Sequence, residues 1–116
     1  MTRLNIGMSI KVAARCNISC KGCFARHWMA QNNRYQLSTR ELVYFLESTI
    51  DSRYFFRFIT LSGGEPLLHP EIKRFVRLIK RSGVCDQIIM FTNGLKLPGL
   101  YYELPDVNRF VVSMII

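Results

Sequence analysis

Three of the four cysteines lie within eight residues, in the stretch Cys16-Asn-Ile-Ser-Cys20-Lys-Gly-Cys23. Three thiolates this close together can converge on one inorganic centre, and iron–sulfur clusters and zinc are the usual occupants of thiolate sites. The spacing differs from that of the bacterial ferredoxin run, and both ferredoxin-type clusters and structural zinc use four protein ligands. This stretch supplies only three cysteines. It therefore predicts a metal centre and leaves the identity of the fourth ligand open.

Two other residues are candidates for that fourth position. Cys85 opens a predicted strand that runs to Thr92, so it would lie roughly 20 Å from the strand's other end and out of reach of the cysteine stretch. We interpret Cys85 as a buried small side chain. His27 would complete a Cys₃His zinc set. Together with the net charge of +8, that set would indicate a zinc-stabilised module that binds nucleic acid.

The pattern of apolar residues predicts the elements that must position the cysteines. A capping box, Ser38 with Glu41, opens one helix, and Pro70 and Gly83 suit the start and end of a second. In the second helix the apolar stripe is Ile72, Phe75, Val76 and Ile79. The expected elements are a strand at 8–13, a helix at 39–50, a strand at 56–61, a helix from about 70 to 82, a strand at 87–92, a loop at 95–107 holding one helical turn at 100–103, and a strand at 108–116.

Apolar strands that alternate with amphipathic helices indicate an α/β fold, with a parallel sheet covered by helices. The chemistry of such sheets collects at the carboxyl ends of the strands. Those ends carry the cysteine stretch, Ser62-Gly-Gly-Glu-Pro66, Thr92-Asn-Gly94 and Ser113. We therefore expect all of these unusual segments to lie along one edge of the sheet.

The glycine-rich segment has a physical interpretation of its own. Gly63 and Gly64 have no Cβ, so a ligand can approach their backbone closely. Backbone groups at the end of a strand have no further ladder partner, and Glu65 adds a negative charge beside them. Pro66 fixes the direction in which the chain leaves the strand. Taken alone, the segment is typical of a turn, but beside the cysteine stretch it favours a ligand-binding site.

The cysteine spacing after a first strand, with Gly63-Gly-Glu-Pro66 after a second, resembles the radical S-adenosylmethionine enzymes. The resemblance covers about residues 6–114 and implies a partial (β/α) barrel of the TIM type. It implies that Cys16, Cys20 and Cys23 hold a [4Fe–4S] cluster whose fourth iron is chelated by S-adenosylmethionine. Reductive cleavage of this cofactor would yield a 5′-deoxyadenosyl radical that takes a hydrogen atom from a substrate. The residues implied in binding S-adenosylmethionine are Gly63, Gly64, Glu65, Asn93 and Ser113.

The chain departs from the family pattern in two ways. Gly22 precedes the third cysteine where a bulky residue is common, and this glycine with Trp28 is similar to activating enzymes for glycyl-radical proteins. The Thr92-Asn-Gly94 turn is instead similar to larger enzymes that modify peptides or small molecules. The family core has six strands, whereas this chain supplies four. We therefore expect residues 1–116 to form one domain that is a fragment of the core, with a cluster loop at 14–28, the glycine motif at 62–66 and the C-terminal strands missing.

The composition of the chain indicates a folded protein and a cellular compartment. A hydrophobic content of 49% argues against disorder, and the chain shows neither a signal peptide nor a membrane span. A cytoplasmic enzyme with reduced thiols is therefore expected, without a membrane partner. We interpret the basic residues of the second helix as a solvated face. The expected partners are S-adenosylmethionine and an electron donor such as flavodoxin or ferredoxin, and the substrate is left open among peptide, RNA, small molecule and partner protein.

Overall fold

The structure is a computed structural model that describes residues 2–14 and 35–113. The elements follow the predicted order of strand, helix, strand, helix, strand, connection and strand. In chain order they are β1 (Thr2–Ala13), α2 (Thr39–Asp51), β2 (Tyr54–Gly63), the 3₁₀ turn η1 (Pro66–Leu68), α3 (Ile72–Ser82), β3 (Cys85–Thr92), α4 (Leu97–Leu100), the 3₁₀ turn η2 (Tyr101–Glu103) and β4 (Arg109–Val112).

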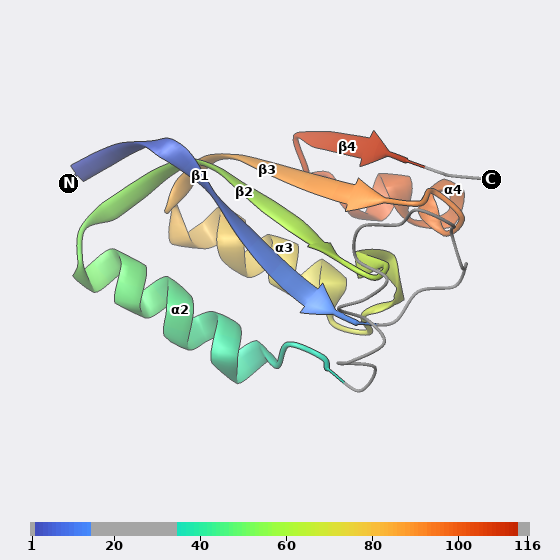
Figure 1. Cartoon of the computed structure of the whole chain (residues 1–116), viewed down its shortest axis with the longest axis horizontal. Helices are drawn as coiled ribbons and strands as arrows, with labels where there is room; N and C mark the ends of the chain where they lie inside the picture. Colours follow the sequence, from blue (N-terminus) through green and yellow to red (C-terminus); the bar gives the residue numbers. More distant parts are fainter. Residues whose placement is uncertain (1, 15–34, 114–116) are drawn as a thin grey trace.

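The four strands form one sheet in the order β1-β2-β3-β4, and every neighbouring pair is parallel. Helices α2 and α3, which connect the first three strands, pack side by side on one face of the sheet (Figure 1). This is the architecture of a partial (β/α) barrel and confirms the predicted fold class. All four strands point in the same direction, so their carboxyl ends meet along one edge.

The start of α2 and the end of α3 lie at the capping residues that the sequence predicts, whereas α3 begins at Ile72, two residues after the expected Pro70. In the capping box the Ser38 amide donates to the Glu41 carboxylate at 3.0 Å, and the Glu41 amide donates to the Ser38 hydroxyl oxygen at 3.1 Å. Hydrogen bonding by Ser38, from its backbone first, lowers the pKa of the Glu41 carboxyl. Gly83 ends α3 in the left-handed conformation, as its position after the apolar stripe predicts. The stripe is buried as expected: Ile72, Phe75, Val76 and Ile79.

Several boundaries differ from the prediction. β2 and β3 are longer than the expected 56–61 and 87–92, and the short helix α4 precedes the single helical turn expected at 100–103. β1 begins at Thr2 rather than at residue 8, because its irregular first half pairs with the aromatic start of β2 although it lacks apolar alternation. β4 ends at Val112, and residues 114–116 of the predicted strand lie outside the described residues. The turn η1 was not predicted, because three residues carry no periodicity.

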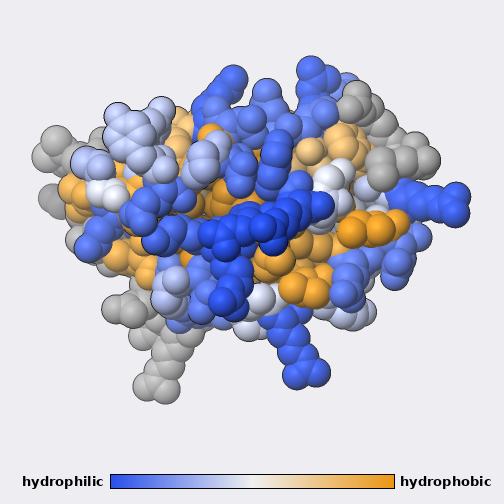
Figure 2. All heavy atoms as spheres, turned by 180° about the vertical axis from the view of Figure 1, so that it is seen from behind, coloured by the Kyte–Doolittle hydropathy of each residue, from blue (hydrophilic) through white to orange (hydrophobic). Residues whose placement is uncertain are grey.

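The outer face of α3 is basic and exposed to solvent. The exposed cations are Lys73, Arg74, Arg77, Lys80 and Arg81. Lys73 pairs with Glu103 at 2.8 Å, and Arg74 lies 3.5 Å from Glu71. Figure 2 shows hydrophilic side chains gathered across the side of the molecule that is seen from behind. The predicted solvated helix face is thus present. Within the described part of the chain, no helix is long and apolar enough to cross a membrane.

Candidate functional site at the carboxyl ends of the strands

The cysteine stretch itself lies outside the described residues, together with Trp28 and His27, but both of its flanks are described. The amide of Ala14 donates to the carbonyl of Tyr35 at 3.1 Å, and the amide of Leu37 donates to the carbonyl of Val12 at 2.8 Å. Ala13 also forms an antiparallel bridge with Gln36. The chain therefore leaves β1 and returns to it at the same point, so the segment that carries the three cysteines begins and ends at this edge of the sheet.

The glycine motif packs directly against the end of β1. Gly63 pairs with Ala13, and the amide of Gly64 donates to the carbonyl of Ala13 at 2.9 Å. Gly63 has φ +142°, and a Cβ added there would lie 2.2 Å from the Ala13 carbonyl oxygen. The close approach that requires a glycine at position 63 is therefore that of the neighbouring strand. The approach of a ligand to Gly63 and Gly64 stays a prediction.

The Glu65 side chain is fully buried and accepts three hydrogen bonds. Its Oε2 accepts from the amide of Leu67 at 3.0 Å and from the hydroxyl of Thr92 at 2.7 Å, and its Oε1 accepts from the amide of Asn93 at 2.7 Å. Leu67 belongs to η1, whereas the other two donors lie at the end of β3. These contacts are all with the protein, whereas the sequence analysis placed Glu65 among the residues expected to bind S-adenosylmethionine, a role that stays a prediction.

Asn93 and Ser113 lie where the sequence places them, at the ends of β3 and β4. The amide oxygen of Asn93 accepts from the backbone N–H of Leu95 at 3.0 Å, which shapes the turn after β3. The amide of Ser113 donates to the carbonyl of Thr92 at 3.0 Å, directly beyond the last strand pair. Their contacts with S-adenosylmethionine stay predictions. We refer to residues 13–14, 63–65, 92–94 and 113 together as the rim.

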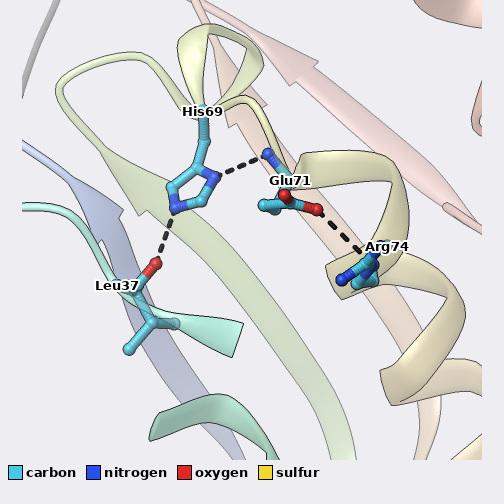
Figure 3. A network of polar contacts seen from close by, with 4 residues as sticks. All are labelled: Leu37, His69, Glu71 and Arg74. Atoms are coloured by element: carbon cyan, nitrogen blue, oxygen red, sulfur yellow. Dashed lines mark hydrogen bonds and ion pairs between the residues drawn. The ribbon is translucent and has the colours of Figure 1, made fainter. Parts of the chain in front are cut away.

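A buried histidine that the sequence analysis did not single out connects the start of α3 with the segment before α2. His69 is 4% exposed, and its Nδ1 accepts from the amide of Glu71 at 3.0 Å. Its Nε2 lies 2.7 Å from the carbonyl of Leu37 and must donate to it, since Nδ1 is the acceptor (Figure 3). The ring packs on Phe75 with centroids 4.5 Å apart. A lone histidine before Pro70 has no spacing pattern, so nothing in the sequence indicates this role.

Cys85 begins β3, at the end of that strand opposite to the rim, as predicted. Burial raises the pKa of its thiol to about 11. Among residues 2–14 and 35–113, no three His, Cys, Asp or Glu side chains are grouped so that they could hold a metal ion. Cys85 is therefore a half-buried thiol at the far end of the sheet, and its position supports a cluster site whose protein ligands come from the cysteine stretch.

The thiol of Cys85 should make folding stability depend on pH in alkaline solution. Its ordinary pKa is 9.0, whereas the folded thiol ionises near pH 11. Between these values the unfolded state binds fewer protons than the folded state, so stability falls as the pH rises. Below pH 9 the contribution is fully present. We expect the Tm, followed by circular dichroism, to fall less steeply between pH 9 and pH 11 in Cys85→Ala than in the unchanged chain. Identical slopes would show that the thiol ionises normally in the folded state.

Comparison with known proteins agrees with this geometry. The family of 4Fe-4S single cluster domains matches residues 7–113, which is nearly the whole chain. The chain belongs to this family, and it is the N-terminal part of a radical S-adenosylmethionine core. The cofactors that this membership implies are a [4Fe–4S] cluster and S-adenosylmethionine.

Among individual relatives, the chain is similar to proteins named GTP 3′,8-cyclase. It is 34% identical to that of Microcystis aeruginosa over 94 residues, which are 80% of this chain and 29% of the relative. It is 31% identical over 109 residues to a probable GTP 3′,8-cyclase of Methanocaldococcus jannaschii, covering 92% of this chain and 35% of the relative. The enzyme of Sulfurimonas denitrificans is 30% identical over 112 residues, with 92% and 34% covered. The chain thus spans about a third of the length of these relatives.

Proposed function

We propose that this chain binds a [4Fe–4S] cluster through Cys16, Cys20 and Cys23 and presents its open iron to S-adenosylmethionine. The observation that carries the proposal is the juxtaposition at the rim. The two flanks of the cysteine segment are hydrogen-bonded to each other at Ala14 and Tyr35, and the adjoining Ala13 carbonyl accepts from the amide of Gly64. The segment that supplies the thiolates and the motif proposed to bind the cofactor are therefore joined through backbone contacts.

The residue types of the sequence fit these cofactors in their chemistry. Three cysteine thiolates match a cluster that keeps one iron free of protein ligands. The carbonyl groups after β2 and β3 are the proposed acceptors for the methionyl ammonium and the ribose hydroxyls, since the amides of Gly64, Asn93 and Gly94 already donate within the protein. When bound, the cluster and S-adenosylmethionine would supply reductive cleavage of a carbon–sulfur bond and a 5′-deoxyadenosyl radical for hydrogen abstraction. The part of this chain is to hold both cofactors in contact at the rim, with Gly63, Gly64, Asn93 and Ser113 as the proposed contacts of S-adenosylmethionine.

The proposed reaction is an oxidoreductase-type radical reaction. The relatives are named for a cyclisation of GTP, so GTP is the first substrate to test. The proposed reductant is a flavodoxin or ferredoxin, since the cluster must receive one electron before the bond can break. The proposed compartment is the cytoplasm, where the thiols stay reduced.

The proposal is tested by anaerobic reconstitution with iron and sulfide, followed by electron paramagnetic resonance of the reduced chain with and without S-adenosylmethionine. We expect about four irons per chain and a signal that changes when the cofactor is added. Cys16→Ala, Cys20→Ala and Cys23→Ala should each lose the cluster. Cys85→Ala is the matched control, because this cysteine lies at the far end of β3, and it should keep iron content and signal.

A His27→Ala variant of the same preparation distinguishes the proposed cluster site from a Cys₃His zinc site. In a Cys₃His zinc site, His27→Ala would lose the metal as completely as a cysteine variant does. In the proposed cluster site, His27→Ala should keep its iron. A chain that retains tightly bound zinc, refuses a cluster and depends on His27 would overturn the proposal.

A further inference from the structure

We propose that Glu65 is a positioning residue that joins the two halves of the rim, and that it acts on the cofactor through the backbone rather than by touching it. One half consists of the ends of β1 and β2, with the cysteine segment and the two glycines. The other half consists of the ends of β3 and β4, with Asn93 and Ser113. The inference rests on the proposed function, which places the cofactor at the rim. The link between the two halves rests on the hydrogen bonds of Glu65.

The sheet divides at the rim, between β2 and β3. The pairing of β1 with β2 continues to Gly63, and the pairing of β3 with β4 continues to Thr92. The pairing of β2 with β3, in contrast, ends earlier, at Leu61 and Met90. The last residues of the two middle strands are thus each attached to an outer strand, while the ladder that should attach them to one another has stopped.

Beyond the end of this ladder, the carboxylate of Glu65 connects β2 to β3 by hydrogen bonds. It follows β2 in the chain, and two of its three donors, the Thr92 hydroxyl at 2.7 Å and the Asn93 amide at 2.7 Å, belong to the end of β3. The third donor, the amide of Leu67 at 3.0 Å, fixes the carboxylate to its own loop. Hydrogen bonds to a buried carboxylate are among the stronger ones in proteins, because the charge strengthens them.

The Thr92 hydroxyl extends the connection into the turn that follows β3. It donates to Glu65 and accepts from the amide of Gly94 at 3.1 Å, so it orients both the carboxylate and the turn. Glu65 is 0% exposed and Thr92 only 5%. A carboxylate that is fully buried and already accepts three protein donors is arranged to hold backbone in place. The groups it places, Gly63 and Gly64 on one side and Asn93 on the other, are those proposed to face the cofactor.

Thr92→Val separates positioning from direct contact, because it removes one donor to Glu65 while changing little in shape. If Glu65 positions the rim, this variant should weaken S-adenosylmethionine binding by about tenfold, measured by titrating the cofactor-induced change in the electron paramagnetic resonance signal. Thr92→Ser restores the hydroxyl and should recover binding to within about twofold. If Glu65 instead binds the ammonium, Thr92→Val frees an oxygen for it, and binding that is unchanged or tighter would overturn the proposal.

Thr49→Val is the matched control. Thr49 is also 5% exposed, and its hydroxyl donates one hydrogen bond, to the carbonyl of Phe45 at 2.9 Å, as the Thr92 hydroxyl donates one to Glu65. Thr49 lies within α2, away from the rim. Thr49→Val should lower the Tm, because it removes a buried donor, while leaving the cofactor titration unchanged. An equal loss of binding in Thr49→Val would show that general destabilisation explains the effect, and the positioning role would be overturned.

A measurement without cofactors tests the geometry independently of the proposed function. Hydrogen exchange of the Asn93 amide should be slow in the unchanged chain and at least tenfold faster in Glu65→Gln. The one amide oxygen of glutamine satisfies two donors when it faces Leu67 and Thr92, and it then leaves an NH₂ group against the Asn93 amide. Equal exchange rates would overturn the joining of the two halves. If exchange responds as expected but the unchanged chain never binds S-adenosylmethionine, the proposed function fails while the structural link between β2 and β3 stands.

Discussion

Gly63→Ala should lower the free energy of unfolding by about 3 kcal/mol or more, which is a large part of the stability of a small domain. The added Cβ would lie 2.2 Å from the carbonyl oxygen of Ala13, and an atom of the neighbouring backbone cannot move aside as a flexible side chain can. The φ of +142° adds backbone strain for any residue with a Cβ. Urea unfolding followed by circular dichroism measures the loss.

The matched control for Gly63→Ala is Gly83→Ala at the end of α3. Gly83 also has a positive φ, +68°, but a Cβ placed there meets no atom within 4 Å. This variant should cost about 1 kcal/mol, the cost of the left-handed conformation alone. The difference between the two variants isolates the contact with the Ala13 carbonyl. Equal losses at both positions would show that β1 can move away from Gly63 at little cost.

The comparison of the two glycines also shows what the sequence can and cannot predict. The role of Gly83 can be predicted from the sequence, because a glycine after an amphipathic stripe is a common helix end. The close packing at Gly63 cannot be predicted, because it depends on a strand that lies 50 residues earlier in the chain. A Gly-Gly pair after a strand indicates only that some atoms come close to the backbone. Whether these atoms belong to a ligand or to β1 is decided by the pairing of Ala13 with Gly63.

The fold was predicted better than the individual contacts, for a physical reason. Apolar periodicity indicates which faces are buried, and the burial of apolar surface is the main driving force that assembles a sheet under two helices. The order of the elements and the shared edge for Gly63, Asn93 and Ser113 followed from it. Periodicity does not predict polar contacts between distant segments. The three donors to Glu65 therefore could not be predicted, although Glu65 itself stood out by its place in the motif.

His69 is the second residue whose loss should be severe. In His69→Ala the carbonyl of Leu37 and the amide of Glu71 both lose their partner in a partly buried site (Figure 3). The ring also no longer fills the space beside Phe75. We expect the free energy of unfolding to fall by about 3 kcal/mol, from the unsatisfied groups and the cavity together. Urea unfolding measures the change, and a loss below about 1 kcal/mol would show that water replaces both hydrogen bonds.

Two conservative variants divide the effect of His69 into its parts. The amide oxygen of His69→Asn lies near the position of Nδ1 and can accept from the Glu71 amide, whereas the amide nitrogen of His69→Gln lies near Nε2 and can donate to the Leu37 carbonyl. Each should lose less stability than His69→Ala. Hydrogen exchange of the Glu71 amide should stay slow in the asparagine variant and become fast in the glutamine variant. The opposite order would mean that the two ring nitrogens have exchanged their roles.

The hydrogen bond from His69 to the carbonyl of Leu37 connects His69 to the flank of the cysteine segment, so the loss of this bond should also affect that segment. Leu37 lies two residues beyond Tyr35, and its amide donates to Val12 of β1, so this point anchors the returning flank of the segment. If that anchor helps to hold the three proposed thiolates together, His69→Gln, which keeps the Leu37 bond, should retain iron longer against a chelator than His69→Asn, which loses it. The two variants each keep one hydrogen bond, so their difference in iron release reports on the anchor rather than on overall stability. Equal rates of release would show that the cysteine segment is held by the backbone pairing of its flanks alone.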